Sequence, residues 1–359
     1  MSVGRAFAIA LLALAAGCAS EPRVLRMDPD PAGRGEGVFF PGPPEVPRYF
    51  YAGQLIGESN YVDASAKAKA GVAGVLRWIA GLAGGSGEPD GLQRPQGGAA
   101  DAQGRTIVSD ASRQALLVFD PARGLDTWEQ AAGLTRFSTP VGVATSPEGH
   151  VWVADADLGF VAELDAKGKP VAAIGKGLLK RPTGVAYDPR TKRLFVCDTH
   201  SHDIKVFGPD RALLKTIGRR GDGEGEFNYP THVTFAGGEL YVADTMNSRV
   251  QVFADAGDRY RLTIGARGLY VGNLVRPKGV AVDSEGNIYV VESYFDHLLV
   301  YDRNGRFLLA IGGLGKDIGQ FYLPAGVWVD ARNRVFVADM FNGRVVVLQY
   351  LGGGAEHEP

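Results

Sequence analysis

Residues 241–253 read YVADTMNSRVQVF, two short apolar segments on either side of a polar turn. Valine, tyrosine and phenylalanine favour extended strands, and the turn follows the acidic residue Asp244. The stretch therefore predicts two antiparallel strands joined by a tight connection.

The same arrangement recurs six times along the chain. Each unit begins at a proline, and successive prolines lie 42 to 48 residues apart: Pro95, Pro140, Pro182, Pro230, Pro277 and Pro324. A short apolar strand follows each proline, and a second strand ends at an acid 14 to 16 residues after it: Asp110, Asp155, Asp198, Asp244, Glu292 and Asp339. A third strand follows, and a fourth often ends in Ile-Gly. Four short strands per unit of this length are typical of a propeller blade. We therefore expect an all-β fold, a six-bladed β-propeller of four-stranded antiparallel blades over residues 95–351.

Two segments resemble the NHL repeat closely, namely residues 241–253 and PKGVAVD at residues 277–283. The resemblance extends over about residues 95–350 and implies a six-bladed propeller of the NHL-repeat type. It implies no particular activity, because one fold of this kind carries unrelated functions.

The last unit ends after its third strand, near Leu351. An open ring would leave an unpaired strand edge, so we expect an N-terminal segment to supply the missing strand. Tyr49–Gly57 is the preferred candidate because it ends Leu-Ile-Gly like the other fourth strands, and Val75–Gly81 is the alternative. Residues 63–82 are then expected to form one peripheral helix, since apolar side chains recur there at helical spacing.

The N-terminus resembles that of a bacterial lipoprotein. Residues 1–17 combine Arg5, a short apolar run and Leu14-Ala15-Ala16-Gly17 before Cys18, which predicts a signal peptide and lipidation of Cys18. Residues 18–47 are expected to form a Pro/Gly-rich tether, residues 48–94 the closing strand and helix, and residues 352–359 a disordered tail. In a Gram-negative host Ala19 is typical of outer-membrane sorting. We therefore expect a cell-envelope protein anchored by its lipid on the periplasmic side of the outer membrane.

The predicted topology places residues beside the prolines and the turns after the acids on one face. The Asn and Arg positions that the resemblance implies are kept as Asn247 with Arg249 and as Asn342 with Arg344, and are replaced in the other units. We predict a partner-binding face formed by His200, His202, His232, Met246, Tyr294, Phe295, His297, Met340 and Phe341. The alternative is that these loops pack against one another between blades.

Basic residues beside the prolines are expected to surround the mouth of the central channel. They are Arg94, Arg181, Arg276 and Lys278, which we predict to form an anion-binding rim. The alternative is that they are solvated and have little electrostatic effect. His232 lies in the same region, at the position that glycine occupies in the five other units.

Metal binding is the weaker interpretation of the acids and histidines. The six acids would form either a carboxylate ring around a cation or a set of structural caps, and their regular repetition favours the caps. His200 and His202, completed by His232 or His297, are the candidate zinc ligands, but two ligands alone do not make a site. Residues 222–226 alternate acids and glycines yet lack the spacing of an EF-hand calcium loop. We therefore predict no cofactor, with calcium or zinc as the alternative.

The sequence predicts a non-catalytic binding or scaffold module that engages a protein or an envelope polymer. The alternative is a periplasmic lyase or hydrolase, resembling a lactonase or an esterase, that uses a cation in the channel. A related propeller family, the peptidyl-hydroxyglycine lyases, uses histidines beside such prolines, whereas Gln96, Val141, Thr183, Thr231, Lys278 and Ala325 follow the prolines here. Cys197 lies where other second strands carry alanine, so we expect a core residue rather than a nucleophile. A formal charge of -2 argues against nucleic-acid binding.

Overall fold

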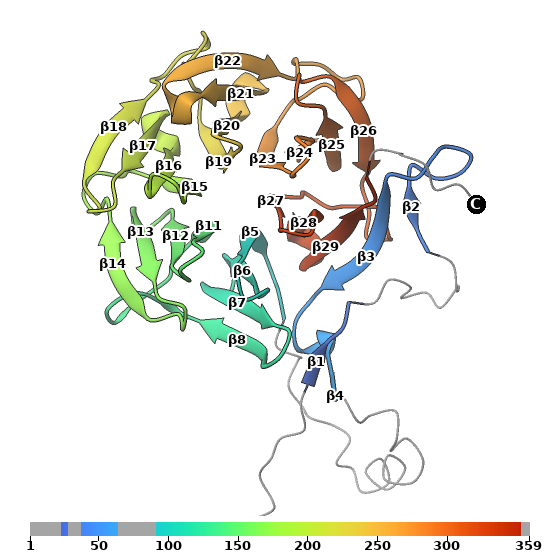
Figure 1. Cartoon of the computed structure of the whole chain (residues 1–359), viewed down its shortest axis with the longest axis horizontal. Coiled ribbons are helices and arrows are strands. Elements are labelled where there is room, and N and C mark those ends of the chain that lie inside the picture. Colours follow the sequence, from blue (N-terminus) through green and yellow to red (C-terminus); the bar gives the residue numbers. More distant parts are fainter. Residues whose placement is uncertain (1–22, 28–36, 64–90, 353–359) are drawn as a thin grey trace, which may run out of the picture.

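The computed structural model describes residues 23–27, 37–63 and 91–352. Six antiparallel sheets surround a common axis, and each places its first strand innermost (Figure 1). This is the six-bladed β-propeller that the repeat predicts. The predicted peripheral helix over residues 63–82 lies outside the described ranges except for Asp63, which ends a strand, and the signal peptide and Cys18 also lie outside them.

Five blades are built from consecutive strands. Blade one contains β5 (Pro95–Ala100), β6 (Thr106–Asp110), β7 (Ala115–Asp120) and β8 (Gly124–Trp128). Blade two contains β11 (Pro140–Thr145), β12 (Val151–Asp155), β13 (Phe160–Leu164) and β14 (Pro170–Ile174). Blade three contains β15 (Pro182–Asp188), β16 (Arg193–Asp198), β17 (Asp203–Phe207) and β18 (Leu213–Ile217). Blade four contains β19 (Pro230–Ala236), β20 (Glu239–Asp244), β21 (Arg249–Ala254) and β22 (Arg259–Ile264). Blade five contains β23 (Pro277–Val282), β24 (Ile288–Glu292), β25 (His297–Tyr301) and β26 (Phe307–Gly312).

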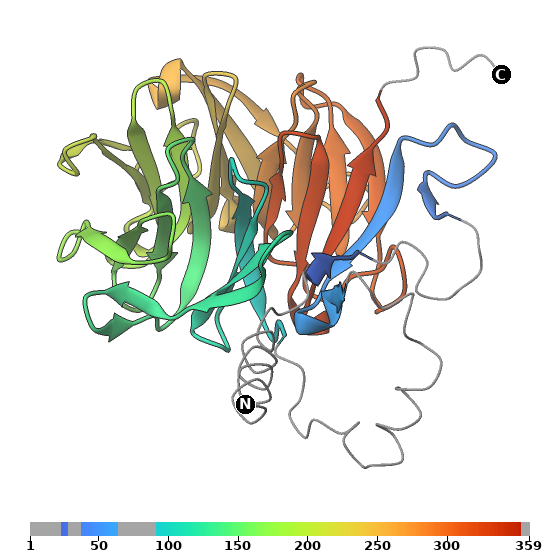
Figure 2. The same cartoon turned by 60° about the horizontal axis from the view of Figure 1, so that its bottom comes forward.

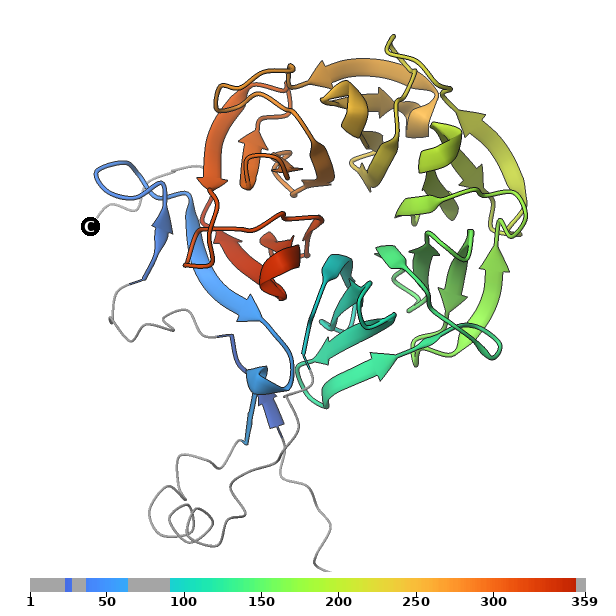
Figure 3. The same cartoon turned by 180° about the vertical axis from the view of Figure 1, so that it is seen from behind.

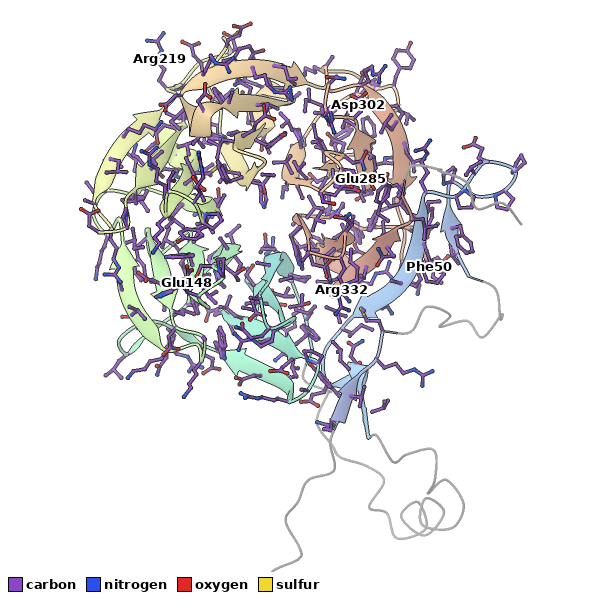
Figure 4. All side chains as sticks on the ribbon, in the orientation of Figure 1. Phe50, Glu148, Arg219, Glu285, Asp302 and Arg332 are labelled. Carbon is purple, nitrogen blue, oxygen red and sulfur yellow. The ribbon has the colours of Figure 1, made fainter. Side chains whose placement is uncertain are left out.

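Blade six joins the two ends of the described chain. Its sheet contains β27 (Val327–Val329), β28 (Arg334–Asp339), β29 (Arg344–Tyr350), β3 (Tyr49–Leu55) and β2 (Phe39–Phe40), in that order from the axis outward. β3 pairs antiparallel with β29 from Val345 opposite Leu55 to Tyr350 opposite Tyr49, so the predicted segment Tyr49–Gly57 supplies the closing strand. Phe50, at the outer edge of this blade in Figure 4, lies 5.3 Å from Phe39 between ring centres.

Short elements lie between the strands of the blades and beside them. β1 (Arg23–Leu25) pairs with β4 (Tyr61–Asp63), and β9 (Gln130–Ala132) pairs with β10 (Thr135–Arg136). The 3-10 turns are η1 (Glu58–Asn60), η3 (Thr199–Ser201), η4 (Thr245–Asn247), η5 (Asp255–Gly257) and η6 (Met340–Asn342). None of the helices among the described residues is long and apolar enough to cross a membrane.

The hydrophobic core lies between neighbouring blades, whose sheets stand side by side around the ring (Figure 2). One cluster joins Ile107 and Val118 of blade one to Val153 and Leu164 of blade two, and all four are buried. Burial on both faces explains why the middle strands are almost continuously apolar, whereas the outer strands are only partly buried. Each blade therefore depends on two neighbours for its burial.

Candidate functional site

One end of the ring carries the prolines and the acids, and we call it the proline face. Pro95 lies opposite Asp110 in the register of β5 and β6, and the same pairing joins Pro140 to Asp155, Pro182 to Asp198, Pro230 to Asp244 and Pro277 to Glu292. The turns η3, η4 and η6 directly follow acids on this face, which is turned toward the viewer in Figure 3. The prediction that the prolines and the turns after the acids lie on one face is confirmed.

The six acids are fully buried structural groups. Each accepts a hydrogen bond from the backbone N–H of the residue two before its own proline: Gln93, Ser138, Lys180, Asn228, Val275 and Tyr322. Three of them, Asp110, Asp155 and Glu292, also accept from N–H groups of the following turn. The expected capping role is thus present in these three blades, but the contact common to all six fixes the segment that enters the blade.

The retained asparagine and arginine have a structural role in the same network. The Asn247 amide donates to Asp244 at 2.8 Å, and Arg249 Nε donates to the same carboxylate at 2.8 Å. Both side chains also donate to carbonyls of the loop before blade four, those of Gly221 and Gly223. Asn342 and Arg344 repeat this arrangement around Asp339. Hydrogen bonds from Asn247 and Arg249 thus hold the Asp222–Glu226 segment as a turn.

The predicted partner-binding residues divide into exposed and buried sets. Met246, Tyr294 and Phe341 are 52%, 56% and 51% exposed. Phe295 and His297 are partly exposed, and His200 is exposed with its ring 6.0 Å from that of Tyr229. Met246, Tyr294, Phe295 and Phe341 therefore offer apolar surface on the proline face.

Two predicted members of the binding face are buried instead. Met340 is 4% exposed, and its sulfur accepts a hydrogen bond from Gln96 in the neighbouring blade at 3.1 Å. His202 is 8% exposed, and its Nδ1 accepts from the Tyr229 N–H at 3.2 Å. Burial, with a smaller contribution from Arg220, lowers the pKa of His202, so this imidazole is a neutral packing group.

The candidate zinc ligands lie at separate places. His200 and His202 flank Tyr229, His297 lines a small cavity with Leu269 and Phe295, and His232 lies in the channel. In residues 23–27, 37–63 and 91–352, no three His, Cys, Asp or Glu side chains are arranged to hold a metal ion. His232 and His297 do not complete a site with His200 and His202.

The channel mouth opens on the proline face as a cavity of about 300 Å³. Arg94, Arg181 and Lys278 line it together with His232, as the sequence predicts, whereas Arg276 is exposed outside the lining. His232 is enclosed by the inner strands but reachable along the channel, and its Nδ1 accepts from the Val280 N–H at 3.4 Å. Burial lowers the pKa of His232 to about 4, so its imidazole is neutral at pH 7.

Several exposed residues of the proline face were not predicted. Leu269, Tyr270 and Val271 form the tip of the loop between β22 and β23, and they are 78%, 84% and 68% exposed. Tyr322 is 44% exposed and lies 5.2 Å from Phe341 between ring centres. Three consecutive apolar residues between two glycines, where the equivalent loop of blade four is polar, were the sequence signal for this tip.

Comparisons with known proteins agree with the fold. The NHL repeat family matches residues 179–207 and 227–253. "Protein brain tumor" of Drosophila melanogaster is 28% identical over 133 residues, which cover 36% of this chain and 12% of that protein. The human "E3 ubiquitin-protein ligase NHLRC1" is 28% identical over 129 residues, which cover 36% of this chain and 31% of that protein. The chain thus aligns with less than a third of either relative.

Solved structures show the same architecture at low identity. A virginiamycin B lyase from Staphylococcus aureus has a TM-score of 0.54 and 13% identity, covering 72% of this chain and 96% of that chain. A gluconolactonase from Xanthomonas campestris has a TM-score of 0.56 and 16% identity, covering 72% of this chain and 86% of that chain. Identities this low establish the fold alone. The chain is a six-bladed β-propeller that contains NHL repeats.

Proposed function

We propose that this propeller is a non-catalytic binding module that docks a protein through the proline face of blades four to six. The observation that carries the proposal is the exposed apolar tip Leu269–Val271. Large apolar residues gathered on one exposed face are typical of protein interaction sites, whereas isolated ones are normal on any surface. Aromatic residues and methionine are also enriched in interface centres.

The apolar tip is not required for the loop to fold. The loops before blades four, five and six share one frame, closed by the parallel bridges Arg220 to Phe227, Arg267 to Leu274 and Leu314 to Phe321. At the tip, blade four has Asp222-Gly223-Glu224 and blade six has Lys316-Asp317-Ile318. Since the frame before blade four forms around polar residues alone, the loop does not need the apolar triplet in order to fold, and the triplet is available to a partner.

Further apolar side chains extend this surface toward the channel mouth. Leu269, Tyr270 and Val271 line a small cavity with Phe295, whose ring lies 4.9 Å from that of Tyr294. In the next blade Tyr322 packs on Phe341, over which the Arg94 guanidinium lies at 5.7 Å. The buried acids hold these loops in place, so a partner would bind a preorganised surface and order little chain on docking.

The chemistry of His232 supports binding rather than acid–base catalysis. A general base works best with a pKa near the operating pH, and the pKa of His232 is about 4. The alternative of a lyase or hydrolase in the channel requires a different proton acceptor among the mouth residues. Assays for lactone, ester and elimination substrates with the purified chain test that alternative, and turnover of any of them that His232→Ala retains would favour it.

The docking proposal is tested by site-specific photo-crosslinking. A photo-reactive residue at Tyr270 is expected to give a discrete crosslinked partner protein, whereas the same residue at Leu214, 50% exposed on the outer strand β18, is expected to give none. With that partner purified, the triple variant Leu269→Ser, Tyr270→Ser, Val271→Ser is expected to weaken binding at least tenfold. The matched control Leu213→Ser, Leu214→Ser should bind normally. Equal binding by both variants would refute the docking surface.

We also propose that a lipid on Cys18 anchors the protein in the cell envelope. The support is the sequence before Cys18, which combines a short apolar run with small residues. Cys18→Ser is expected to move the protein from the membrane to the soluble fraction, and metabolic labelling with a fatty acid should be lost with it. Retention of the variant in the membrane fraction would contradict the anchor.

A further inference from the structure

We propose that the channel mouth is a binding site for a compact dianion, a phosphate group or a dicarboxylate, held by Lys278, Arg94 and His232. Phosphate and dicarboxylate share the chemistry that the mouth recognises, namely two negative charges within a few ångströms. This inference concerns a small-molecule site and goes beyond the docking of a protein partner.

The lining of the mouth has cations without carboxylates. Its positively charged residues are Arg94, Arg181 and Lys278, which come from three different blades, and none of the lining residues is Asp or Glu. A concave site lined by one sign of charge concentrates ions of the opposite sign.

Two of these cations lack a compensating carboxylate among the described residues. Arg181 is neutralised by Asp157, with the guanidinium nitrogen 2.7 Å from the carboxylate oxygen. Arg94 lies over the Phe341 ring, and within the described part of the chain neither Arg94 nor Lys278 has an acid within ion-pair distance. The unpaired charge at the mouth therefore matches a ligand with two negative charges.

Lys278 is the centre of this site. Burial lowers the pKa of its ammonium group, and the nearby Arg276 and Arg94 lower it further. A half-buried cation beside like charges and without a counter-ion is unfavourable. An anion in the cavity converts the same arrangement into charge-assisted hydrogen bonds, which are stronger than bonds between neutral groups.

His232 adds a neutral donor below the cations. Because its Nδ1 accepts from the Val280 N–H, the neutral ring carries its proton on Nε2. The residue lines both the mouth and the channel beneath it. The hydroxyls of Thr183 and Thr231 are committed elsewhere, since they donate to the carbonyls of Thr231 and Lys278 in the following blades. These bonds between blades fix the shape of the cavity.

The proposal is tested by titration calorimetry on the full chain at constant ionic strength. Inorganic phosphate and succinate are the two probes, and acetate and chloride are the controls. We expect one mole of phosphate or of succinate to bind per chain and to raise Tm with concentration, as a ligand of the native state must. Binding of phosphate alone assigns the site to phosphate groups, and binding of succinate alone assigns it to dicarboxylates. Binding of neither probe above the acetate control overturns the proposal.

Variants separate a ligand site from a structural one. Lys278→Met is expected to weaken binding at least tenfold, and the matched control Lys167→Met, an exposed lysine in the turn after β13, should bind normally. Without anion, the Tm of Lys278→Met should equal or exceed that of the unaltered chain, because the substitution removes an unpaired half-buried charge. A large fall in Tm would make Lys278 structural and overturn the proposal. Leu269–Val271 are intact in this variant, so a negative result leaves the docking proposal untouched.

Discussion

His232 replaces a glycine whose small size allows the inner strands to meet. A Cβ added at Gly97, Gly142, Gly184, Gly279 or Gly326 would come within 2.4 to 3.0 Å of the next inner strand. Between blades four and five, the imidazole and its bond from Val280 take the place of that close approach. One substitution in the repeat therefore gives the channel a polar donor.

The depressed pKa of His232 predicts acid sensitivity. The folded protein disfavours the charged imidazole, so stability is complete above the ordinary histidine pKa of about 6.5 and falls as the pH drops toward about 4. Between pH 7 and pH 5 this residue is expected to remove about 2 kcal/mol from the free energy of unfolding. His232→Asn should lose correspondingly less over that interval, as urea titrations at both pH values would show. An identical pH dependence in the two proteins would contradict this assignment.

The substitution Asp244→Ala tests the structural role of the buried acids. Its carboxylate accepts from Asn228, Asn247, Arg249 and Gln251, and Asp244→Ala would leave Arg249 without its charge partner. We expect a loss of about 3–5 kcal/mol in the free energy of unfolding, the range for breaking a buried ion pair. The control Asp258→Ala removes an acid that is 62% exposed and should change stability by less than about 1 kcal/mol. Similar small effects of both substitutions would argue against a structural acid.

At the scale of elements, β3 decides whether the ring closes. Its inward side chains Tyr49, Tyr51 and Leu55 are buried at 2%, 1% and 1% exposure, and the Tyr49 hydroxyl lies 3.2 Å from that of Tyr289 in blade five. Without β3, the last sheet would present the unpaired edge of β29, a surface prone to association.

Two truncations test this closure. A chain that starts at Gly37 retains β3 and is expected to be a folded monomer. A chain that starts at Gly91 lacks β3 and is expected to self-associate or to remain unfolded. Size-exclusion chromatography with light scattering and a urea titration distinguish the two states. A monomeric, cooperatively folded chain from Gly91 onward would show that the ring does not need its N-terminal strand.

At the scale of the whole molecule, we expect the closed ring to unfold as one unit, because each blade shares its core with its neighbours. Ile107 of blade one and Ile288 of blade five are both fully buried in clusters shared with a neighbouring blade. Ile107→Ala and Ile288→Ala should each lower one common unfolding transition by about 2–5 kcal/mol. Near-UV circular dichroism and tryptophan fluorescence should report the same midpoint in each variant. Separate transitions for the two probes would show that blades unfold independently.

The sequence by itself determined the repeat and the number of blades, and it favoured Tyr49–Gly57 over Val75–Gly81 as the closing strand. Strand formation follows from local alternation and turn residues, and a regular spacing of prolines and acids fixes the register within each blade. For that reason the proline face and the convergence of Arg94, Arg181, Lys278 and His232 could be predicted.

Only the tertiary structure decided which side chains of that face reach solvent. Met340 was predicted to be exposed but is covered by Gln96, which is 244 residues away in the sequence. His202 is covered by Tyr229, while Leu269–Val271 are left uncovered at a loop tip. The exposure of a turn residue depends on what the neighbouring blade places over it. The contacts that cover Met340 and His202 join residues far apart in the chain, so no local pattern of the sequence encodes their burial.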